Sequence, residues 1–162
     1  MIALPLHLVA AAVLLSGSHE RTVPVAGGGF DSLNTAIVHS KQDTPTGSIQ
    51  TSTETVELTG SLIGRVLYQV TTAIDTAHGT LVNTGHSVFS GTIAGSAPVL
   101  IHDDQSRFEV NLVTGKERGQ VSLADHLSGP KVRCTLDVVG TGVNADGNPT
   151  FTYTGQCTFS GE

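Results

Sequence analysis

The chain has 162 residues, enough for one domain with a hydrophobic core and too few for two. Only 14% of its residues are charged, and the formal net charge is −6, from 8 Lys and Arg against 14 Asp and Glu. The chain has no run of basic residues, which argues against nucleic acid and anionic membrane surfaces as partners, because both require a cationic patch.

The N-terminal residues 1–18 begin with an apolar run, Ile2–Leu15, followed by the small residues Ser16, Gly17 and Ser18. The run is shorter than the roughly 20 residues of a membrane span, and its length matches the hydrophobic region of a secretory signal. Because no Lys or Arg precedes it, a buried or amphipathic helix of the mature protein is the alternative. We predict a signal peptide over 1–18, a secreted protein, and no membrane span in its mature form.

Residues 19–52 show no sustained alternation of apolar and polar residues. The three glycines at 27–29 are costly to fix in one backbone conformation, and the sequence at 44–47 is typical of a turn. Only Thr35–His39 has the composition of a short strand. We therefore predict that residues 19–52 form a flexible lead-in and that the folded domain comprises residues 53–162.

From residue 53 onward, apolar and polar residues alternate as they do in half-buried strands. The first long run extends to Thr71 and contains Gly60 and Gly64, which predict a sharp bend or a bulge. The other expected strands are Thr80–Ala94, Val99–His102, Arg107–Val113 and Gln120–Ala124. The polar residues His102–Gln105 predict a turn.

The C-terminal segment has the clearest pattern, with the turn sequence Asn144–Gly147 between two alternating runs. A hairpin centred on this turn places four pairs on one face: Gly140 with Phe151, Val138 with Tyr153, Leu136 with Gly155, and Cys134 with Cys157. Directly opposed Cβ atoms lie about 4.5–5.5 Å apart, close to disulfide spacing. We predict a Cys134–Cys157 disulfide, which indicates an oxidising compartment; two buried free thiols are the alternative.

These segments predict an all-β fold, a single antiparallel β-barrel of seven or eight strands closed by the disulfide-bonded C-terminal hairpin. Strands with one apolar and one polar face must close on themselves or pack against a second sheet. The long strands interrupted by glycine favour a barrel over a sandwich, because such positions allow strong bending.

No pattern for catalysis or for a cofactor is present. The seven histidines have no metal-ligand spacing, and the segment from Asn144 lacks the acidic residue that closes a calcium loop. There is no Gly-x-Ser-x-Gly elbow and no phosphate- or dinucleotide-binding glycine loop followed by a helix. We predict no metal site and no cofactor, and the sequence leaves open whether the protein is an enzyme.

Four residues on faces assigned to the interior are candidate ligand contacts: Tyr68, Asn83, Phe89 and Tyr153. Polar groups inside a barrel can orient a bound molecule. The alternative is that each polar side chain makes one hydrogen bond within a filled core.

A stretch of the chain resembles the central hairpin of allene oxide cyclase-like barrels, with their Phe-x-Gly-Thr-x-x-Gly turn. The residues concerned are Tyr68-Gln69-Val70, Gly79-Thr80 and the run Gly85–Gly95, which contains Phe89-Ser90-Gly91-Thr92-Ile93-Ala94-Gly95. Over about residues 55–160, the resemblance implies an eight-stranded antiparallel barrel with an apolar cavity. Members of that family bind hydrophobic chains, and some cyclise or isomerise them. No catalytic residue of the family can be matched onto this chain.

Two functions follow from the sequence. In the first, the secreted barrel binds a small hydrophobic molecule, with cyclisation or isomerisation as a possible activity. In the second, it is a non-catalytic extracellular structural or interaction domain with a packed core, which acts through its Thr-rich outer surface. The many glycines and few large aromatic residues on the inward faces favour the first, because their side chains would not fill an eight-stranded barrel.

Overall fold

The C-terminal hairpin pairs in the predicted register. In the computed structural model, which describes residues 20–161, strand β9 faces strand β10 with Val138 opposite Tyr153 and Cys134 opposite Cys157. The two cysteines form a disulfide with their Cα atoms 4.1 Å apart, so both the pairing and the disulfide are confirmed. The predicted signal peptide, residues 1–18, lies outside the described residues.

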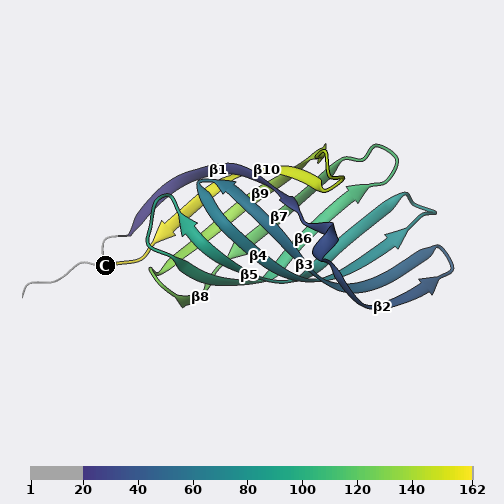
Figure 1. Ribbon diagram of the computed structural model, residues 1–162, viewed down its shortest axis with the longest axis horizontal. Helices are drawn as coiled ribbons and strands as arrows, with labels where there is room; N and C mark the ends of the chain where they lie inside the picture. The colour runs from purple at the N-terminus through teal and green to yellow at the C-terminus, as the bar shows by residue number, and fades with distance from the viewer. Residues whose placement is uncertain (1–19, 162) are drawn as a thin grey trace, which may run out of the picture.

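The fold is all-β, and eight of its strands form a closed antiparallel barrel (Figure 1), which confirms the predicted class. Around the wall the order is β1-β10-β9-β7-β6-β5-β4-β3, and β3 pairs with β1 to close the ring. The bounds are β1 Arg21–Asp31, β2 Ile37–Thr44, β3 Gly47–Gly60, β4 Leu62–Asp75, β5 Thr80–Ile93, β6 Val99–Asn111, β7 Glu117–Leu123, β8 Asp125–Ser128, β9 Val132–Val143 and β10 Pro149–Phe159. Within the part of the chain that the structure describes, no helix is long and apolar enough to cross a bilayer.

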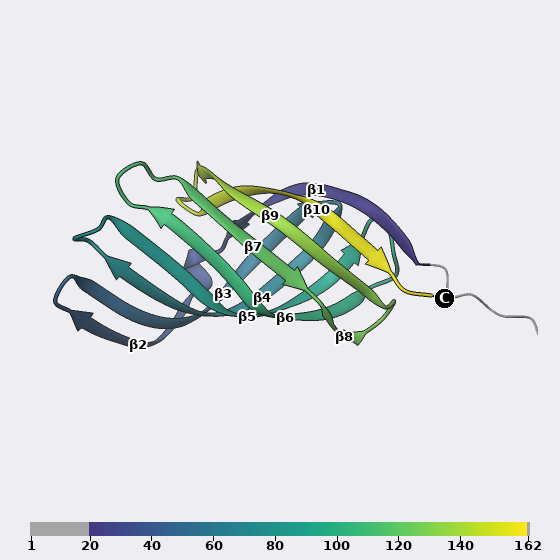
Figure 2. The ribbon, with the colours of Figure 1, turned by 180° about the vertical axis from the view of Figure 1, so that it is seen from behind.

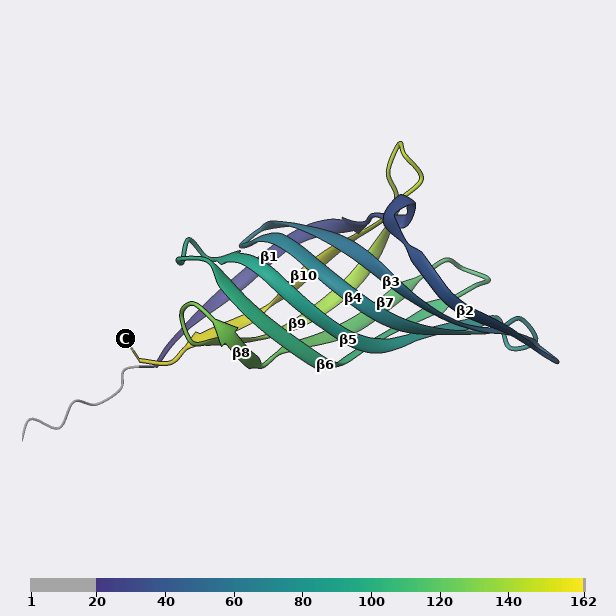
Figure 3. The same ribbon diagram turned by 60° about the horizontal axis from the view of Figure 1, so that its bottom comes forward.

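The predicted flexible lead-in, residues 19–52, is wrong, because most of it is strand. β1 pairs with β10 from Arg21 to Phe30, and its last residues, 27–31, pair with residues 56–60 of β3. After the short 3₁₀ turn Leu33–Thr35, β2 pairs with residues 47–53 of β3. We call β2 and the adjoining ends of β3 to β6 the extension; it projects from one end of the barrel (Figure 3).

The glycines at 27–29 predict a loop from local sequence alone, but they lie within strand β1. They are required there by contacts with residues far away in the sequence. A Cβ atom on Gly27 would lie 2.1 Å from the carbonyl oxygen of Thr59 and 2.4 Å from the Tyr153 hydroxyl. A Cβ atom on Gly29 would lie 2.7 Å from the ring of Phe151. Glycine is therefore needed where β1 passes between its two neighbours, despite its cost in a strand.

The polar turn predicted at His102–Gln105 is also absent, because β6 continues through it with an irregularity in its pairing to β5. The buried Asp103 carboxylate accepts the backbone N–H groups of Gln105 (2.7 Å), in the irregular part of β6, and of Ser122 (2.9 Å), in β7. The connection that follows β7 contains a further short strand, β8, which pairs with β6 at the lower edge of Figure 2.

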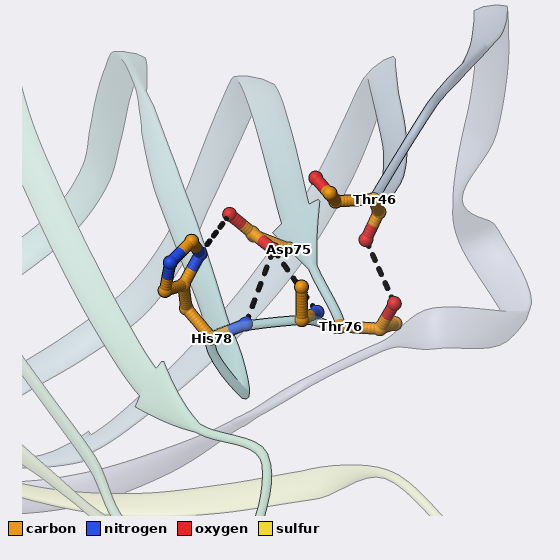
Figure 4. Close-up of polar contacts among 5 residues, drawn as sticks. Thr46, Asp75, Thr76 and His78 are labelled. Carbon is orange, nitrogen blue, oxygen red and sulfur yellow. Dashed lines mark hydrogen bonds and ion pairs between the residues drawn. The ribbon is translucent and has the colours of Figure 1, made fainter.

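The β4–β5 turn at the tip of the extension is held by polar contacts (Figure 4). The Asp75 carboxylate accepts the backbone N–H groups of Ala77 and His78 and contacts the His78 ring at 2.7 Å. The hydrogen bond from the His78 side chain holds the pKa of Asp75 below its ordinary value. Thr76 donates both its N–H and its hydroxyl to the Thr46 carbonyl, which joins this turn to the β2–β3 turn.

Replacing both cysteines with serine should lower the free energy of unfolding by about 3 kcal/mol, because the disulfide closes a loop with a sequence separation of 23. Chemical denaturation of the variant beside the native protein, with and without reductant, measures this. Reductant should shift the native midpoint and leave the variant unchanged; equal midpoints under all conditions would contradict the prediction.

Candidate functional site

The inner face of the barrel has two chemically different halves. The half away from the extension, the apolar half, contains the buried core residues Val25, Leu62, Phe89, Ile93, Val99, Ile101, Leu123, Val132, Leu136 and the disulfide. The half next to the extension, the polar half, contains Asp31, Glu54, Tyr68, Asn83, Asp103 and Glu117, together with several serines. The polar half is the candidate site.

Strand register places the centre of this site. Glu54 of β3 faces Tyr68 of β4, Tyr68 faces Ser87 of β5, and Ser87 faces Asp103 of β6. Directly opposed residues of antiparallel strands point to the same side of the sheet, so these four side chains form one row across the inner wall.

Asp31 brings a second carboxyl group to Glu54. It is the last residue of β1 and faces Val56, which is two residues from Glu54 on the same side of β3. Burial, then the charge and the side-chain hydrogen bond of Glu54, then the charge of Glu117, raise the pKa of Asp31 to about 7. Close to neutral pH this carboxyl group can therefore hold or release a proton.

A third acid, Glu117, lies on the inner face at the start of β7, where it faces Val110 of β6. A Cβ atom on Gly140 would lie 2.7 Å from the Glu117 Cβ atom, so the glycine makes room for this side chain. Burial raises the pKa of Glu117 above its ordinary value. Glu54 itself accepts a short hydrogen bond, 2.6 Å, from the Ser52 hydroxyl.

Tyr68 is 7% exposed, and its ring meets that of Phe108 edge to face at 6.2 Å between centroids. Burial raises the pKa of the Tyr68 hydroxyl to about 12. The polar side chain of Ser106 acts to lower this pKa, and the negative charges of Glu54, Asp103 and Asp31 raise it further. The Ser106 hydroxyl donates to the Gly85 carbonyl at 3.0 Å. The Tyr68 hydroxyl makes no hydrogen bond of normal geometry within residues 20–161.

Two further buried oxygens in the polar half have no hydrogen-bond partner among the described residues: Asp31 Oδ1 and Asn83 Oδ1. Buried polar atoms normally have a partner, and each one left without costs about 1–3 kcal/mol. Asp103 contrasts with them, because its carboxylate accepts two backbone N–H groups.

The structure separates the four predicted ligand contacts into two pairs. All four lie inside the barrel, but only Tyr68 and Asn83 belong to the polar half. Phe89 is fully buried in the apolar core. The Tyr153 hydroxyl accepts the Leu62 N–H at 2.8 Å and donates to the Thr59 carbonyl at 2.9 Å, so it fixes the β3–β4 bend.

Three acids of the polar half, Asp31, Glu54 and Glu117, were missed by sequence analysis for separate reasons. Asp31 fell in the segment predicted to be a flexible lead-in, and Glu117 fell between the predicted strands Arg107–Val113 and Gln120–Ala124. Glu54 could have been found, because it extends the inward-facing alternation of Val56 and Leu58 by one step.

Outside the barrel, two hollows of about 490 and 500 Å³ lie on the wall, the first over β3–β6 and the second over β9 and β10. They are lined mostly by outward-facing polar residues, among them Gln69, His86, Arg107, Arg133 and Gln156. His86 stacks on His102 on the same outer face as the first hollow.

No group of His, Cys, Asp or Glu within residues 20–161 is arranged to hold a metal ion.

The two interior tyrosines should respond differently to loss of the hydroxyl. Tyr153→Phe should lower the free energy of unfolding by about 1–3 kcal/mol, because it leaves the Leu62 N–H buried without a partner. Tyr68→Phe should change it by less than about 0.5 kcal/mol or raise it, because the hydroxyl makes no hydrogen bond of normal geometry with residues 20–161 that could be lost. Denaturant titration of both variants measures this; equal losses would show that the Tyr68 hydroxyl also has a structural role.

Stability should fall as pH rises from about 4 to 7 and level off above, because folded Asp31 binds its proton more tightly than the unfolded chain does. Allowing for partial exposure, the change is on the order of 2 kcal/mol. Asp31→Asn should flatten this part of the profile, measured as denaturation midpoints between pH 4 and 8. The exposed Asp137→Asn is the control. A profile that Asp31→Asn leaves unchanged would contradict the assignment.

Comparisons with models of known protein families, with characterised proteins and with solved structures found no match to this chain. The resemblance to allene oxide cyclase-like barrels therefore stays a prediction. Any functional conclusion has to come from the chemistry of the polar half and of the outer wall.

Proposed function

We propose that the protein binds a small, largely apolar molecule through the polar half of its barrel. The observation that carries this proposal is a set of three buried oxygens in the polar half, Asp31 Oδ1, Tyr68 Oη and Asn83 Oδ1, that have no hydrogen-bond partner among residues 20–161. A bound molecule with hydrogen-bonding groups would satisfy them and recover the cost of their burial.

The surroundings of these oxygens suit the apolar part of such a molecule. The partly buried Val56, Val66, Phe108 and Phe151 adjoin the core and lie on inward-facing positions of their strands. A ligand would place its apolar body against these side chains and its polar group toward Asp31 and Tyr68.

An isomerisation or cyclisation of the bound molecule is a natural extension of this proposal. Such a reaction moves a proton from one atom of the substrate to another and needs no further reactant. Asp31, whose pKa is raised to about 7, would give a proton to the substrate, and Glu54 would take one from it. The proton would then return from Glu54 to Asp31 through the side-chain hydrogen bond between them, which restores both groups.

Secretion is part of the proposal. The Cys134–Cys157 disulfide supports an oxidising compartment, in agreement with the signal peptide predicted over 1–18.

The second candidate function is an extracellular interaction domain that acts through its outer wall. It is favoured by the two surface hollows, whose outward-facing lining includes Thr51, Thr71, Thr84, Thr135 and Thr158. In that case the unpartnered interior oxygens would bind ordered water.

Native mass spectrometry of protein secreted by its natural host tests the first proposal, since a small molecule should copurify with it. The double variant Glu54→Gln/Tyr68→Phe should lose that molecule, whereas Glu57→Gln, which alters an acid on the outer face of the same strand, should retain it. If no molecule copurifies and a panel of lipids and polyketides produces no thermal shift, the interior does not bind ligand and the outer-wall function replaces it. Retention by the double variant would place the molecule elsewhere.

A further inference from the structure

Three acids of the polar half, Asp31, Glu54 and Glu117, form no ion pair with a Lys or Arg side chain among residues 20–161. All eight Lys and Arg side chains are exposed. The Arg ion pairs of the described residues involve Glu57, Glu109 and Glu20, which do not belong to the polar half.

Carboxylates that are partly removed from water without a counter-charge are costly, and proteins normally pair them or protonate them. Asp31 and Glu117 show this cost as raised pKa values. A cation placed among the three acids would offset this cost of burying unpaired carboxylates, so the charge of the interior favours a positive ligand.

Tyr68 provides an independent observation. Its side chain is more than nine-tenths buried, its hydroxyl has no partner among the described residues, and the charges of Glu54 and Asp31 act on that hydroxyl. Its ring and that of Phe108 form an edge-to-face pair beside the acids. Aromatic rings next to carboxylates are typical surroundings of a bound organic cation.

The unpartnered atoms also indicate which kind of cation fits. Asp31 Oδ1 and Asn83 Oδ1 are acceptors, and the Tyr68 oxygen can accept as well. They require a ligand that donates hydrogen bonds, which a primary ammonium does three times and a quaternary ammonium does not. A metal ion fits less well, since the described residues contain no metal-holding group.

We propose that the molecule bound in the polar half carries a primary ammonium group on an apolar body, with the ammonium among Asp31, Glu54 and Glu117 and beside Tyr68. This inference rests on the proposed function, because it names the class of molecule that the interior binds. The ammonium donates to Asp31, Asn83 and Tyr68 while its apolar chain lies against Phe108 and the adjoining core residues.

Isothermal titration of the full barrel with hexylammonium, hexanol, hexanoate and hexyltrimethylammonium tests the inference. Hexylammonium should bind at least tenfold more tightly than the other three. Glu117→Gln and Glu54→Gln should each weaken hexylammonium binding by about fivefold or more, and Glu57→Gln should leave it unchanged. Thermal unfolding of each variant shows whether it is folded.

Two outcomes separate this inference from the function on which it rests. If hexanol or hexanoate binds as tightly as hexylammonium and Tyr68→Phe weakens it, the interior binds small molecules but does not select a cation. If none of the four probes binds and nothing copurifies from the host, both proposals fail.

Lys41 is the side chain of this chain that could compete with a ligand by placing its own positive charge among the three acids. It faces Gln50 on the inner side of the extension, and its side chain is exposed. Lys41→Gln should leave stability and hexylammonium affinity unchanged; a destabilised variant with higher affinity would show that the Lys41 ammonium itself occupies the acidic site, which overturns the proposal.

Discussion

Closure of this barrel depends on a single strand that pairs on both of its edges. β1 lies between β10 and the second half of β3, and without it both of those strands would present unpaired backbone groups at an open edge. The close approach on both sides requires glycine at positions 27 and 29, where any Cβ atom would meet backbone or an aromatic ring. The same strand ends at Asp31, so the constraint that closes the wall also delivers a carboxyl group to the interior.

The boundary between the apolar and the polar half lies near the point where the pairing of β1 with β3, which closes the barrel, ends at Asp31. On one side of that point, facing strands contribute Leu, Ile, Val, Phe and the disulfide, and Tyr153 uses its hydroxyl fully. On the other side, the wall opens into the extension, and acids, amides and hydroxyls lie on the inner face beside apolar residues such as Val70 and Phe108. The continuous hydrophobic core therefore lies in the apolar half, whereas the polar half combines a few packed residues with a cluster of acids.

Sequence alone predicted the features that depend on local alternation. The β9–β10 register could be read from residues 134–157, and the same alternation placed Tyr68, Asn83, Phe89 and Tyr153 on inward faces. It could not distinguish Tyr68 from Tyr153, because the difference lies in the β3–β4 bend that reaches only one of them. It missed β1, because the glycines at 27–29 make sense only beside Tyr153 and Phe151, which are more than a hundred residues away. Of β2 it found only the first residues, within the predicted strand Thr35–His39.

The pairing of β1 with β10 joins nearly the two ends of the described chain, with Arg21 facing Phe159. Such non-local contacts form late, because the entropy of closing a long loop must be overcome first. During synthesis β1 is made first, yet its partner β10 emerges last. Asp31 can join Glu54 only after β1 has docked along β3, so the acid pair forms only when the wall is complete. The proposed ligand site would therefore be complete only in a fully folded molecule, and a partly translated chain would lack it.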